Sequence, residues 1–398
     1  MKRHLGILMI AFATAAFAQT AIAAWGDYDT TFGFLGAALD DIANHRPTAV
    51  AVQPDGKILV TGYRTLSTGR RRFFLRRYLS NGQVDTSFGS NGSAVSNALL
   101  NLNADYAGYR VLVQANGRIV VSGIGNGNPT IWRFFSSGSA DTSIGNGGMR
   151  SLSAYGGNTP PVTTYANILY VGVAVDSTTP SIVLKFNSGG SQDMSFGTNG
   201  ELITDAARSF SLGVDPTTGN LLVSGRRRSD PNDYGIERFL PTGALDPSFT
   251  HYGATYTGWT GSLPSQFVRL ANGQFALNQR WINVAQGGGG LLGADLVRLS
   301  SSGNYTSRTT YEPTVFLNFL DYGCPDIIAQ QGDGRLILKG TNSDEIFRFS
   351  TSFASVQTMS CANYEGFDNL TQAVLQSDDK MIAAGTYNGH IAIIRTLP

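Results

Sequence analysis

The sequence predicts an all-β protein: a seven-bladed β-propeller of four-stranded antiparallel blades, with the ring closed by an N-terminal strand. Three observations lead to this prediction. A tight turn followed by an apolar strand recurs seven times along the 398 residues, a second motif follows it in four of the repeats, and one more copy of that second motif precedes the first repeat. The 48 glycines agree with a chain of many tight turns.

The first element of each repeat is a hairpin. Asp55-Gly56 and Asn116-Gly117 stand between apolar runs, and such dipeptides favour a two-residue turn because both central residues take positive φ. Equivalent turns recur about fifty residues apart, so each repeat is one supersecondary unit with loops of variable length. The turns lie at residues 56, 117, 166, 219, 273, 334 and 379, the third being a degenerate copy.

The third and fourth strands of a repeat carry two further signatures. The third strand ends in a cation, an aromatic residue and a turn that contains glycine, as in residues 77–82 and 133–138. An Asp-x-Ser-Phe-Gly segment then leads into the fourth strand, as in residues 85–89 and 193–197. Four strands in each of seven repeats match a β-propeller.

These motifs resemble the delta-60 repeat family, a bacterial repeat whose signature combines a D-G-K-I-x-V-x-G hairpin, an R-Y-x-x-x-G strand end and an L-D-x-S-F-G-x-x-G segment. The resemblance covers nearly the whole mature chain. It is closest in the first, second and fourth repeats, whereas the fifth to seventh lack the D-x-S-F-G segment. The resemblance implies an extracellular or envelope protein with a propeller-like fold, and it implies no particular activity because the family has no agreed one.

The two ends of the chain are predicted to close the ring together. Residues 29–36 are a copy of the D-x-S-F-G segment that stands before the first hairpin, and the seventh repeat stops after its third strand at residues 391–397. The strand around residues 34–39 is therefore expected to complete the last blade. A ring joined in this way has no open edge between its first and last blades.

The N-terminus has the pattern of a secretory signal peptide. Lys2 and Arg3 precede an apolar stretch at residues 5–18, and cleavage after Ala18 or after Ala23 both fit the small-residue pattern. We expect residues 1–23 to be the signal peptide and residues 24–398 a single propeller domain. The stretch is too short for a good membrane anchor. The expected location is the periplasm, the cell surface or the extracellular space.

Export places the two cysteines, Cys324 and Cys361, in an oxidising compartment that permits a disulfide between them. The sequence does not decide whether they come within bonding distance. No histidine lies near either thiol in sequence, so we expect no metal site there. The net charge of +1 excludes a nucleic-acid footprint, and the clusters Arg70–Arg72 and Arg226–Arg228 are predicted to be solvated loops.

A binding site is expected on the face that carries the variable loops, because connections that differ between blades are free to carry function. Aromatic rings and carboxylates on this face suit a sugar, since rings stack on apolar sugar faces and carboxylates accept hydroxyl protons. The candidates are Trp259, Trp281, Tyr106, Tyr322, Tyr364, Asp40, Asp205 and Asp368. For the tyrosines the alternative is packing between blades, because Asp-Tyr-Ala-Gly and its variants recur at one place in three repeats.

No catalytic, cofactor or metal-binding motif stands out. The three histidines beyond the signal are dispersed without zinc-binding spacing, and no G-x-S-x-G elbow occurs. We therefore expect an exported, monomeric, non-catalytic binding or scaffold propeller that recognises a glycan or an envelope protein through the variable face. Two alternatives stay open: a polysaccharide hydrolase or lyase on the same face, and a purely structural surface module.

Overall fold

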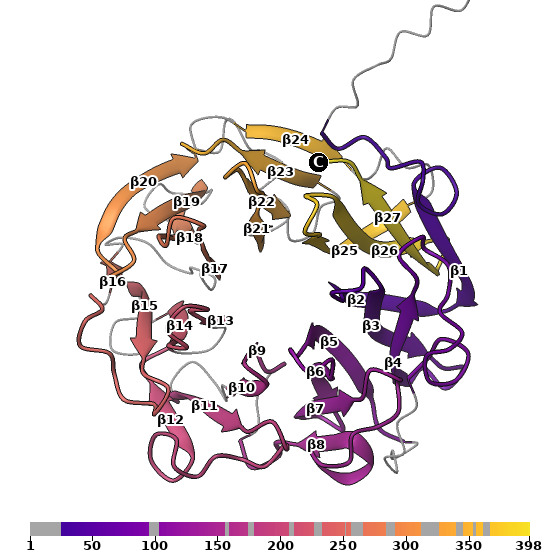
Figure 1. Cartoon of the computed structure of the whole chain (residues 1–398), viewed down its shortest axis with the longest axis horizontal. Helices are drawn as coiled ribbons and strands as arrows, with labels where there is room; N and C mark the ends of the chain where they lie inside the picture. The colour runs from indigo at the N-terminus through magenta and orange to yellow at the C-terminus, as the bar shows by residue number, and fades with distance from the viewer. Residues whose placement is uncertain are drawn as a thin grey trace, which may run out of the picture.

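The computed structural model is a ring of seven antiparallel sheets (Figure 1). It describes residues 25–94, 103–155, 159–173, 179–206, 211–226, 233–250, 252–255, 266–283, 291–311, 326–339, 345–352, 356–360 and 367–398. The all-β prediction and the count of seven blades are thereby confirmed.

The first four blades follow one another along the chain, each with its strands in sequence order. Blade 1 holds β2 (His45–Val52), β3 (Ile58–Thr65) and β4 (Arg71–Tyr78). Blade 2 holds β5 (Tyr106–Val113), β6 (Ile119–Gly125), β7 (Asn128–Phe134) and β8 (Met149–Ser151), with the 3₁₀ turn η1 (Asn146–Gly148) before β8. Blade 3 holds β9 (Val162–Tyr165), β10 (Ile168–Val173), β11 (Ser181–Phe186) and β12 (Glu201–Thr204), and blade 4 holds β13 (Ser211–Val214), β14 (Leu221–Arg226), β15 (Asp233–Phe239) and β16 (Tyr252–Thr255).

The last three blades complete the ring. Blade 5 holds β17 (Gln266–Arg269), β18 (Phe275–Asn283), β19 (Leu291–Leu299) and β20 (Tyr305–Tyr311). Blade 6 holds β21 (Asp326–Gln330), β22 (Leu336–Lys339), β23 (Glu345–Phe349) and β24 (Val356–Ser360). Blade 7 holds β25 (Phe367–Leu375), β26 (Met381–Tyr387), β27 (His390–Thr396) and, as its outer strand, β1 (Ala37–Ala43).

Ring closure by the N-terminal strand is confirmed. β1 pairs antiparallel with β27, with Ala37 opposite Ile394 and Leu39 opposite Ala392. Blade 1 has three strands among the residues that the structure describes. Its fourth position starts where Ser93 bridges Arg76 and the backbone N–H of Ala94 donates to the Leu75 carbonyl at 2.8 Å, just before the first gap.

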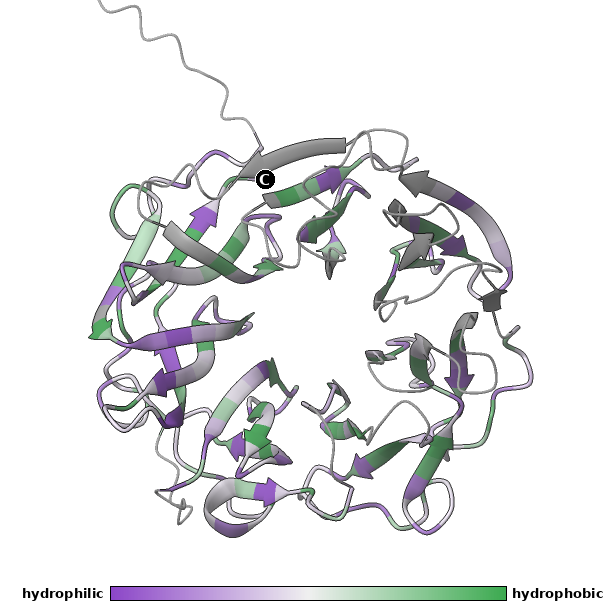
Figure 2. Ribbon diagram, turned by 180° about the vertical axis from the view of Figure 1, so that it is seen from behind, coloured by the Kyte–Doolittle hydropathy of each residue, from purple (hydrophilic) through white to green (hydrophobic). Residues whose placement is uncertain are grey.

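The hydrophobic core lies between neighbouring blades rather than inside a single one. One buried cluster joins Val50, Ile58 and Val60 of blade 1 to Ile382 and Ile393 of blade 7. Hydrophobic residues lie along the strands around the ring (Figure 2), and in β3 Ile58 and Val60 face blade 7 while Leu59 faces blade 2. Burying each large aliphatic side chain contributes about 1.5–3 kcal/mol. Each blade is thus stable mainly through the two blades that flank it.

The recurrent third-strand cation and the aspartate of the Asp-x-Ser segment form a joint between blades, here called the inter-blade staple. In blade 1, Arg77 Nε donates to the Asp85 carboxylate at 2.9 Å, and the guanidinium lies 4.3 Å from the Phe88 ring. Its Nη1 reaches across to blade 2 and donates to the Ser136 carbonyl at 2.6 Å. One side chain therefore ties its own blade to the next.

The same contact between a third-strand cation and the next blade recurs around the ring. Cations donate to a turn carbonyl of the following blade at six of the seven junctions: Arg395 to Ser80, Arg77 to Ser136, Arg133 to Ser188, Lys185 to Pro241, Arg238 to Ser301 and Arg298 to Thr351. At the remaining junction, between blades 6 and 7, the Arg348 guanidinium lies 4.5 Å from the ring of Trp25. The N-terminal segment thus supplies the seventh contact as well as β1.

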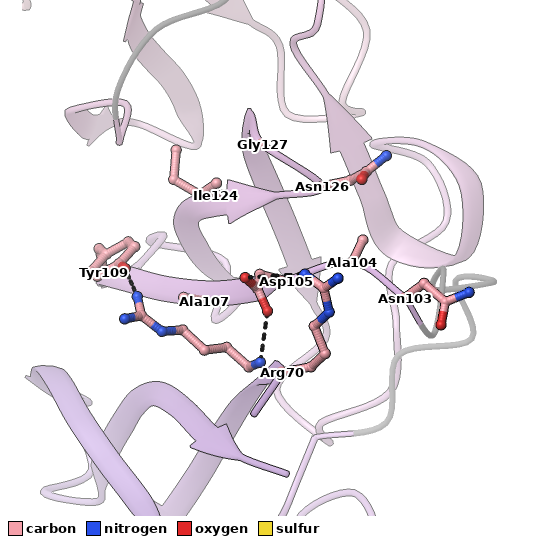
Figure 3. Close-up of a pocket in the computed structure, with 10 residues that line it drawn as sticks. Arg70, Asn103, Ala104, Asp105, Ala107, Tyr109, Ile124, Asn126 and Gly127 are labelled. Carbon is pink, nitrogen blue, oxygen red and sulfur yellow. Dashed lines mark hydrogen bonds and ion pairs between the residues drawn. The ribbon is translucent and has the colours of Figure 1, made fainter. Parts of the chain in front are cut away.

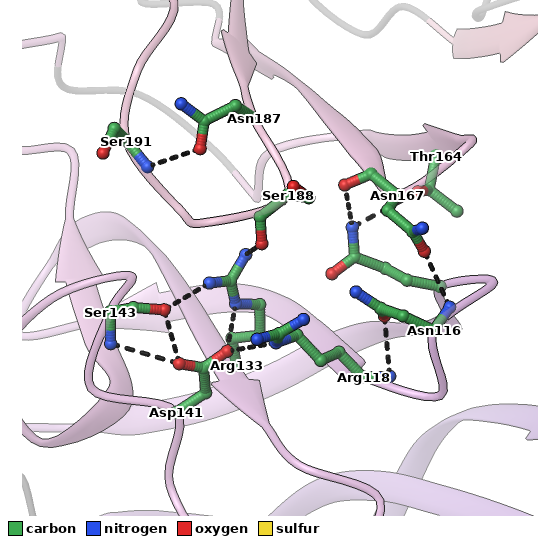
Figure 4. A network of polar contacts seen from close by, with 11 residues as sticks. Asn116, Arg118, Arg133, Asp141, Ser143, Thr164, Asn167, Asn187, Ser188 and Ser191 are labelled. Atoms are coloured by element: carbon green, nitrogen blue, oxygen red, sulfur yellow. Dashed lines mark hydrogen bonds and ion pairs between the residues drawn. The ribbon is translucent and has the colours of Figure 1, made fainter.

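The staple is densest in blade 2. Arg133 is fully buried, and its guanidinium contacts Asp141 at 2.8 Å while donating to the Ser143 hydroxyl at 2.7 Å (Figure 4). Arg118 adds a second cation on the same carboxylate, at 2.7 Å. A buried ion pair of this kind is costly to break on one side only, because the remaining charge keeps its desolvation cost.

The staple aspartates predict how stability depends on pH. Burial raises the pKa of Asp85 and of Asp246, but hydrogen bonds from Ser87 and Ser248 and the charges of Arg77 and Arg238 outweigh it, so both pKa values lie below the usual range. A depressed carboxyl pKa contributes stability that is fully present above the unfolded-state value near 4 and is lost as the pH falls through the folded-state value.

We therefore expect the urea midpoint to be constant from pH 7 to about pH 5 and to fall steeply below about pH 4. Each unit by which a carboxyl pKa is lowered is worth about 1.4 kcal/mol of unfolding free energy, and the lowered pKa values of the staple aspartates all act in the same direction. Urea unfolding followed by circular dichroism across this range checks the prediction. A midpoint that stays flat down to pH 2.5 would contradict it.

Candidate functional site

The variable loops gather on one face because antiparallel strands send successive connections to opposite faces. The regular hairpins and the Asp-x-Ser segments lie on one face, where the staples form. The connections between β3 and β4 and between β6 and β7 lie on the other, with the segment that enters β5. This second face, here called the variable face, carries a pocket at the junction of blades 1 and 2.

The pocket has a volume of about 420 Å³, which is in the usual size range of small-molecule sites. Blade 1 contributes two arginines from the end of its β3–β4 loop, and blade 2 contributes the segment entering β5 and the β6–β7 turn (Figure 3). The lining residues are Arg70, Arg71, Asn103, Ala104, Asp105, Ala107, Tyr109, Ile124, Asn126 and Gly127.

Local turn chemistry fixes the blade 2 side of the pocket. The Asn126-Gly127 turn has φ of 52° at Asn126 and 77° at Gly127, the positive values that a two-residue hairpin turn requires and that asparagine and glycine tolerate best. The backbone N–H of Asn126 donates to the Asp105 carbonyl at 2.8 Å. This bond holds the turn over the start of β5.

Asp105 is the residue that joins the two blades at the pocket. Its carboxylate accepts a hydrogen bond from the backbone N–H of Arg71 at 2.8 Å, and its other oxygen lies 3.9 Å from Nη1 of Arg70. The Arg71 guanidinium extends past it, 4.5 Å from the Tyr63 ring and with Nη1 3.4 Å from the Tyr109 hydroxyl. Figure 3 shows Arg70, Asp105 and Tyr109 on one side of the pocket.

The third arginine of the cluster has a different place. Arg72 is buried, donates to the Ala104 carbonyl at 2.5 Å and lies 5.8 Å from the Tyr106 ring. The prediction of a solvated loop therefore holds for the exposed Arg70 and Arg71 and is wrong for Arg72. Its guanidinium holds in place the segment that enters β5, and this segment lines the pocket.

Two of the sequence-predicted site residues are interior in the structure. The Asp40 carboxylate is fully buried, where it pairs with Arg76 and accepts a hydrogen bond from the Tyr78 hydroxyl at 2.7 Å. It thereby links β1 of blade 7 to β4 of blade 1. Tyr106 is 4% exposed and packs in the blade 1–2 core, which favours the packing alternative for this tyrosine.

The other candidates are not brought together by the residues that the structure describes. Asp205 follows β12 in blade 3, away from both Asp40 and Tyr106. Trp281 lies in β18 and Asp368 in β25, but their side chains are outside the description. Trp259, Tyr322, Tyr364 and both cysteines, Cys324 and Cys361, lie outside the described residues altogether.

Sequence reasoning missed the pairing of the pocket's arginines with Asp105, and the place of the Asn126 turn beside them. The signals were present: Asn126-Gly127 is a hairpin dipeptide, and Asp105 precedes a strand on the variable face. The sequence did not show that Arg70 and Asp105 meet across a blade junction.

In the described part of the chain, no group of three or more histidine, cysteine, aspartate or glutamate residues could hold a metal ion. No helix among these residues is long and apolar enough to span a membrane.

Comparisons with known proteins agree on the fold. The chain is similar over its length to three solved structures: a catalytically inactive virginiamycin B lyase from Staphylococcus aureus with quinupristin (12% identity, 91% of this chain and 98% of that one, TM-score 0.55), hydrazine synthase from Kuenenia stuttgartiensis (10%, 90% and 97%, 0.56) and YCF48 from Cyanidioschyzon merolae (13%, 90% and 98%, 0.53). Identities this low show the fold alone. No curated protein matches the sequence.

One family model matches the chain itself. It is described as a domain of unknown function, the DUF5122 beta-propeller, and it covers residues 53–88 and 114–143. These stretches contain the hairpin, the third-strand cation and the staple aspartate of blades 1 and 2. The chain is therefore a seven-bladed β-propeller in which parts of the first two blades match the model of the DUF5122 beta-propeller domain.

Proposed function

We propose that this protein is an exported binding propeller without a catalytic role, and that its variable face recognises a glycan through the pocket between blades 1 and 2. The observation that carries the proposal is the composition of that pocket. Guanidinium, carboxylate, amide and phenol groups line it beside the apolar side chains of Ala104, Ala107 and Ile124. A sugar ring offers the complementary pattern, with hydroxyl groups around its rim and apolar C–H faces.

The pocket favours binding over hydrolysis. Glycosidases generally place two carboxyl groups on either side of the scissile bond. The residues that line this pocket include one carboxylate, Asp105, and its oxygens already face the Arg71 N–H and the Arg70 guanidinium. A site of this kind can hold a ligand but does not supply two carboxyl groups to act as general acid and general base.

A ligand screen by thermal unfolding tests the proposal. A glycan at 100 times its dissociation constant is expected to add about 2.7 kcal/mol of stability and so raise Tm by several degrees. Asn126→Ala should remove most of that shift. Asn388→Ala is the matched control, because Asn388 occupies the same kind of Asn-Gly turn with φ of 49° in blade 7, far from the pocket.

Three other results are informative. Shifts that survive Asn126→Ala would place the glycan elsewhere on the protein and overturn the assignment of the pocket. Release of reducing ends from a polysaccharide would favour the hydrolase or lyase alternative. If no glycan raises Tm and an Asn126→Lys variant crosslinks to a defined protein, an envelope protein is favoured as the partner.

A further inference from the structure

We infer that the sugar bound in this pocket is an acidic one, with a carboxylate that binds between Arg70 and Arg71. The inference rests on the proposed function and adds the chemical class of the ligand. It is argued from the distribution of charge in blade 1, the partners of each cation there and the shape of the pocket.

Charge is concentrated in blade 1, although the whole chain carries a net charge of only +1. Between Asp55 and Asp85 the sequence contains no aspartate or glutamate. Over the same stretch it contains the cations Lys57, Arg64, Arg70, Arg71, Arg72, Arg76 and Arg77. A positive stretch of this kind in a near-neutral protein raises the local concentration of anions.

Most of these cations are satisfied within the protein, on the opposite face or in the core. Arg76 pairs with Asp40 and Arg77 with Asp85, both buried. Lys57 lies 3.5 Å from the Asp85 carboxylate and 3.4 Å from that of Asp55. The charges of the staple face are therefore largely balanced, which leaves the excess on the variable face.

The two arginines of the pocket are balanced only in part. Arg70 has an exposed side chain and lies 3.9 Å from Asp105, the long end of the range for an ion pair. The contacts of the Arg71 guanidinium are the Tyr63 ring and the Tyr109 hydroxyl, which orient it without neutralising it. With one carboxylate for two guanidinium groups, the pocket carries a net positive charge.

A ligand carboxylate matches this arrangement better than a neutral sugar does. Guanidinium groups bind carboxylates through two parallel hydrogen bonds, and such charge-assisted bonds are about twice as strong as neutral ones. The stacking on Tyr63 holds Arg71 in one orientation, so less side-chain entropy is lost when the ligand binds. The apolar wall at Ala107 and Ile124 can contact the apolar face of a sugar ring. A bare inorganic anion has no such face.

Titration calorimetry with acidic polysaccharide oligomers tests the inference. Oligomers of galacturonate, mannuronate and glucuronate are each compared with their carboxyl-reduced counterparts, which keep the sugar chain and lose the charge. We expect at least one acidic oligomer to bind about tenfold to a hundredfold more tightly than its reduced form, the range for a hydrogen bond to a charged group. The difference should shrink as salt is added, because exposed charges are screened.

Variants of the pocket assign the effect to its arginines. Arg71→Gln should weaken binding of the acidic oligomer about tenfold or more and leave the reduced oligomer unchanged. Arg335→Gln is the matched control, since Arg335 is an exposed arginine beside an aspartate on the opposite face, in blade 6. Asp105→Asn is expected to strengthen binding of the acidic oligomer, because it removes the competing negative charge.

The outcomes separate the two proposals. If acidic and reduced oligomers bind equally well and both depend on Asn126, the glycan site stands and the acidic class is wrong. If inorganic phosphate at equal ionic strength displaces the acidic oligomer as well as an excess of that oligomer does, the pocket selects charge alone and the inference is overturned. If no oligomer of either kind binds, both proposals fail.

Discussion

A chain shortened to begin at Asn44 is expected to lose its cooperative unfolding transition and to aggregate. The deletion removes β1, so that β27 becomes an open strand edge in blade 7, and open edges pair readily with other chains. It also removes the fully buried Phe32, whose loss from a core costs about 3–5 kcal/mol. The whole stability of a domain is about 5–15 kcal/mol.

The same deletion leaves two cations of blade 7 without their carboxylate. Asp29 contacts Arg395 at 2.8 Å and Lys380 at 3.0 Å, and the aspartate side chain is 4% exposed. The Arg395 and Lys380 side chains are 11% and 28% exposed, so water can replace part of the lost interaction and the cost should be about 1–2 kcal/mol. Added to the loss of Phe32 and of the β1 pairing, it brings the total close to the stability of a whole domain. Removal of Trp25 takes away the contact with Arg348 between blades 6 and 7 as well.

Circular dichroism against temperature and light scattering after size exclusion would check this prediction. A chain that begins at Ala24 serves as the control, because it keeps Trp25, Asp29 and β1. A synthetic peptide of residues 24–44 added in trans should restore part of the transition, since the strand acts through contacts rather than through its covalent link. A shortened chain that stays monomeric and melts within a few degrees of the control would contradict the closure argument.

The fold could be predicted because its signals are local and repeated. Turns that contain a glycine, such as the one at Gly117 with φ of 79°, depend on neighbours within a few residues, and seven copies make the period plain. The expected turn type is wrong at the regular hairpins, because Asp55 and Asn116 do not take the positive φ that a two-residue turn requires. Closure by β1 could also be predicted. Residues 29–36 are an extra copy of the segment that leads into a fourth strand, and the seventh repeat has only three strands of its own. The meaning of the recurrent arginine and aspartate was not foreseen, since the staple reaches into the next blade.

The candidate site could be predicted only to the level of a face. In the sequence Asp40 looks like a surface acid because it precedes a loop. In the structure β1 places it against β4 of blade 1, where it is buried in contact with Arg76 and Tyr78. Arg72 looks like a solvated cation, yet the junction of two blades buries it, where it donates to the Ala104 carbonyl. Both differences arise from contacts between blades. No local pattern reports such contacts when the repeats vary in length.

The motif that marks the repeat therefore describes assembly rather than activity. The residues matched by the family model include Arg77, Asp85, Arg133 and Asp141, and all four belong to staples on the face opposite the pocket. The pocket residues Arg70 and Arg71 also fall within the matched residues 53–88, but they lie where the second strand connects to the third, and this connection differs in length and sequence from blade to blade. Ligand preference can thus differ between proteins that share the repeat.

The second large effect is expected from removing a single staple carboxylate, Asp141. Arg133 has no exposed surface, and the Asp141 carboxylate forms ion pairs with both Arg133 and Arg118 while its other oxygen accepts from the Ser143 hydroxyl at 2.5 Å. Asp141→Ala leaves the Arg133 guanidinium buried without a counter-ion. We expect a loss of about 3–5 kcal/mol in the free energy of unfolding, the range for breaking a buried ion pair on one side.

Asp193→Ala in blade 3 is the matched comparison, because Asp193 holds the same place in the motif but pairs with Lys185 nearer to the solvent, at 3.0 Å. The two side chains are 26% and 13% exposed, so water can replace the lost partner and the cost should be about 1–2 kcal/mol. Urea unfolding of both variants at pH 7 measures the difference directly. Equal losses in the two blades would mean that the aspartate stabilises the turn through its serine bond alone. A larger loss at Asp141 would show that the buried ion pair with Arg133 stabilises blade 2 beyond what the turn bonds of the motif provide.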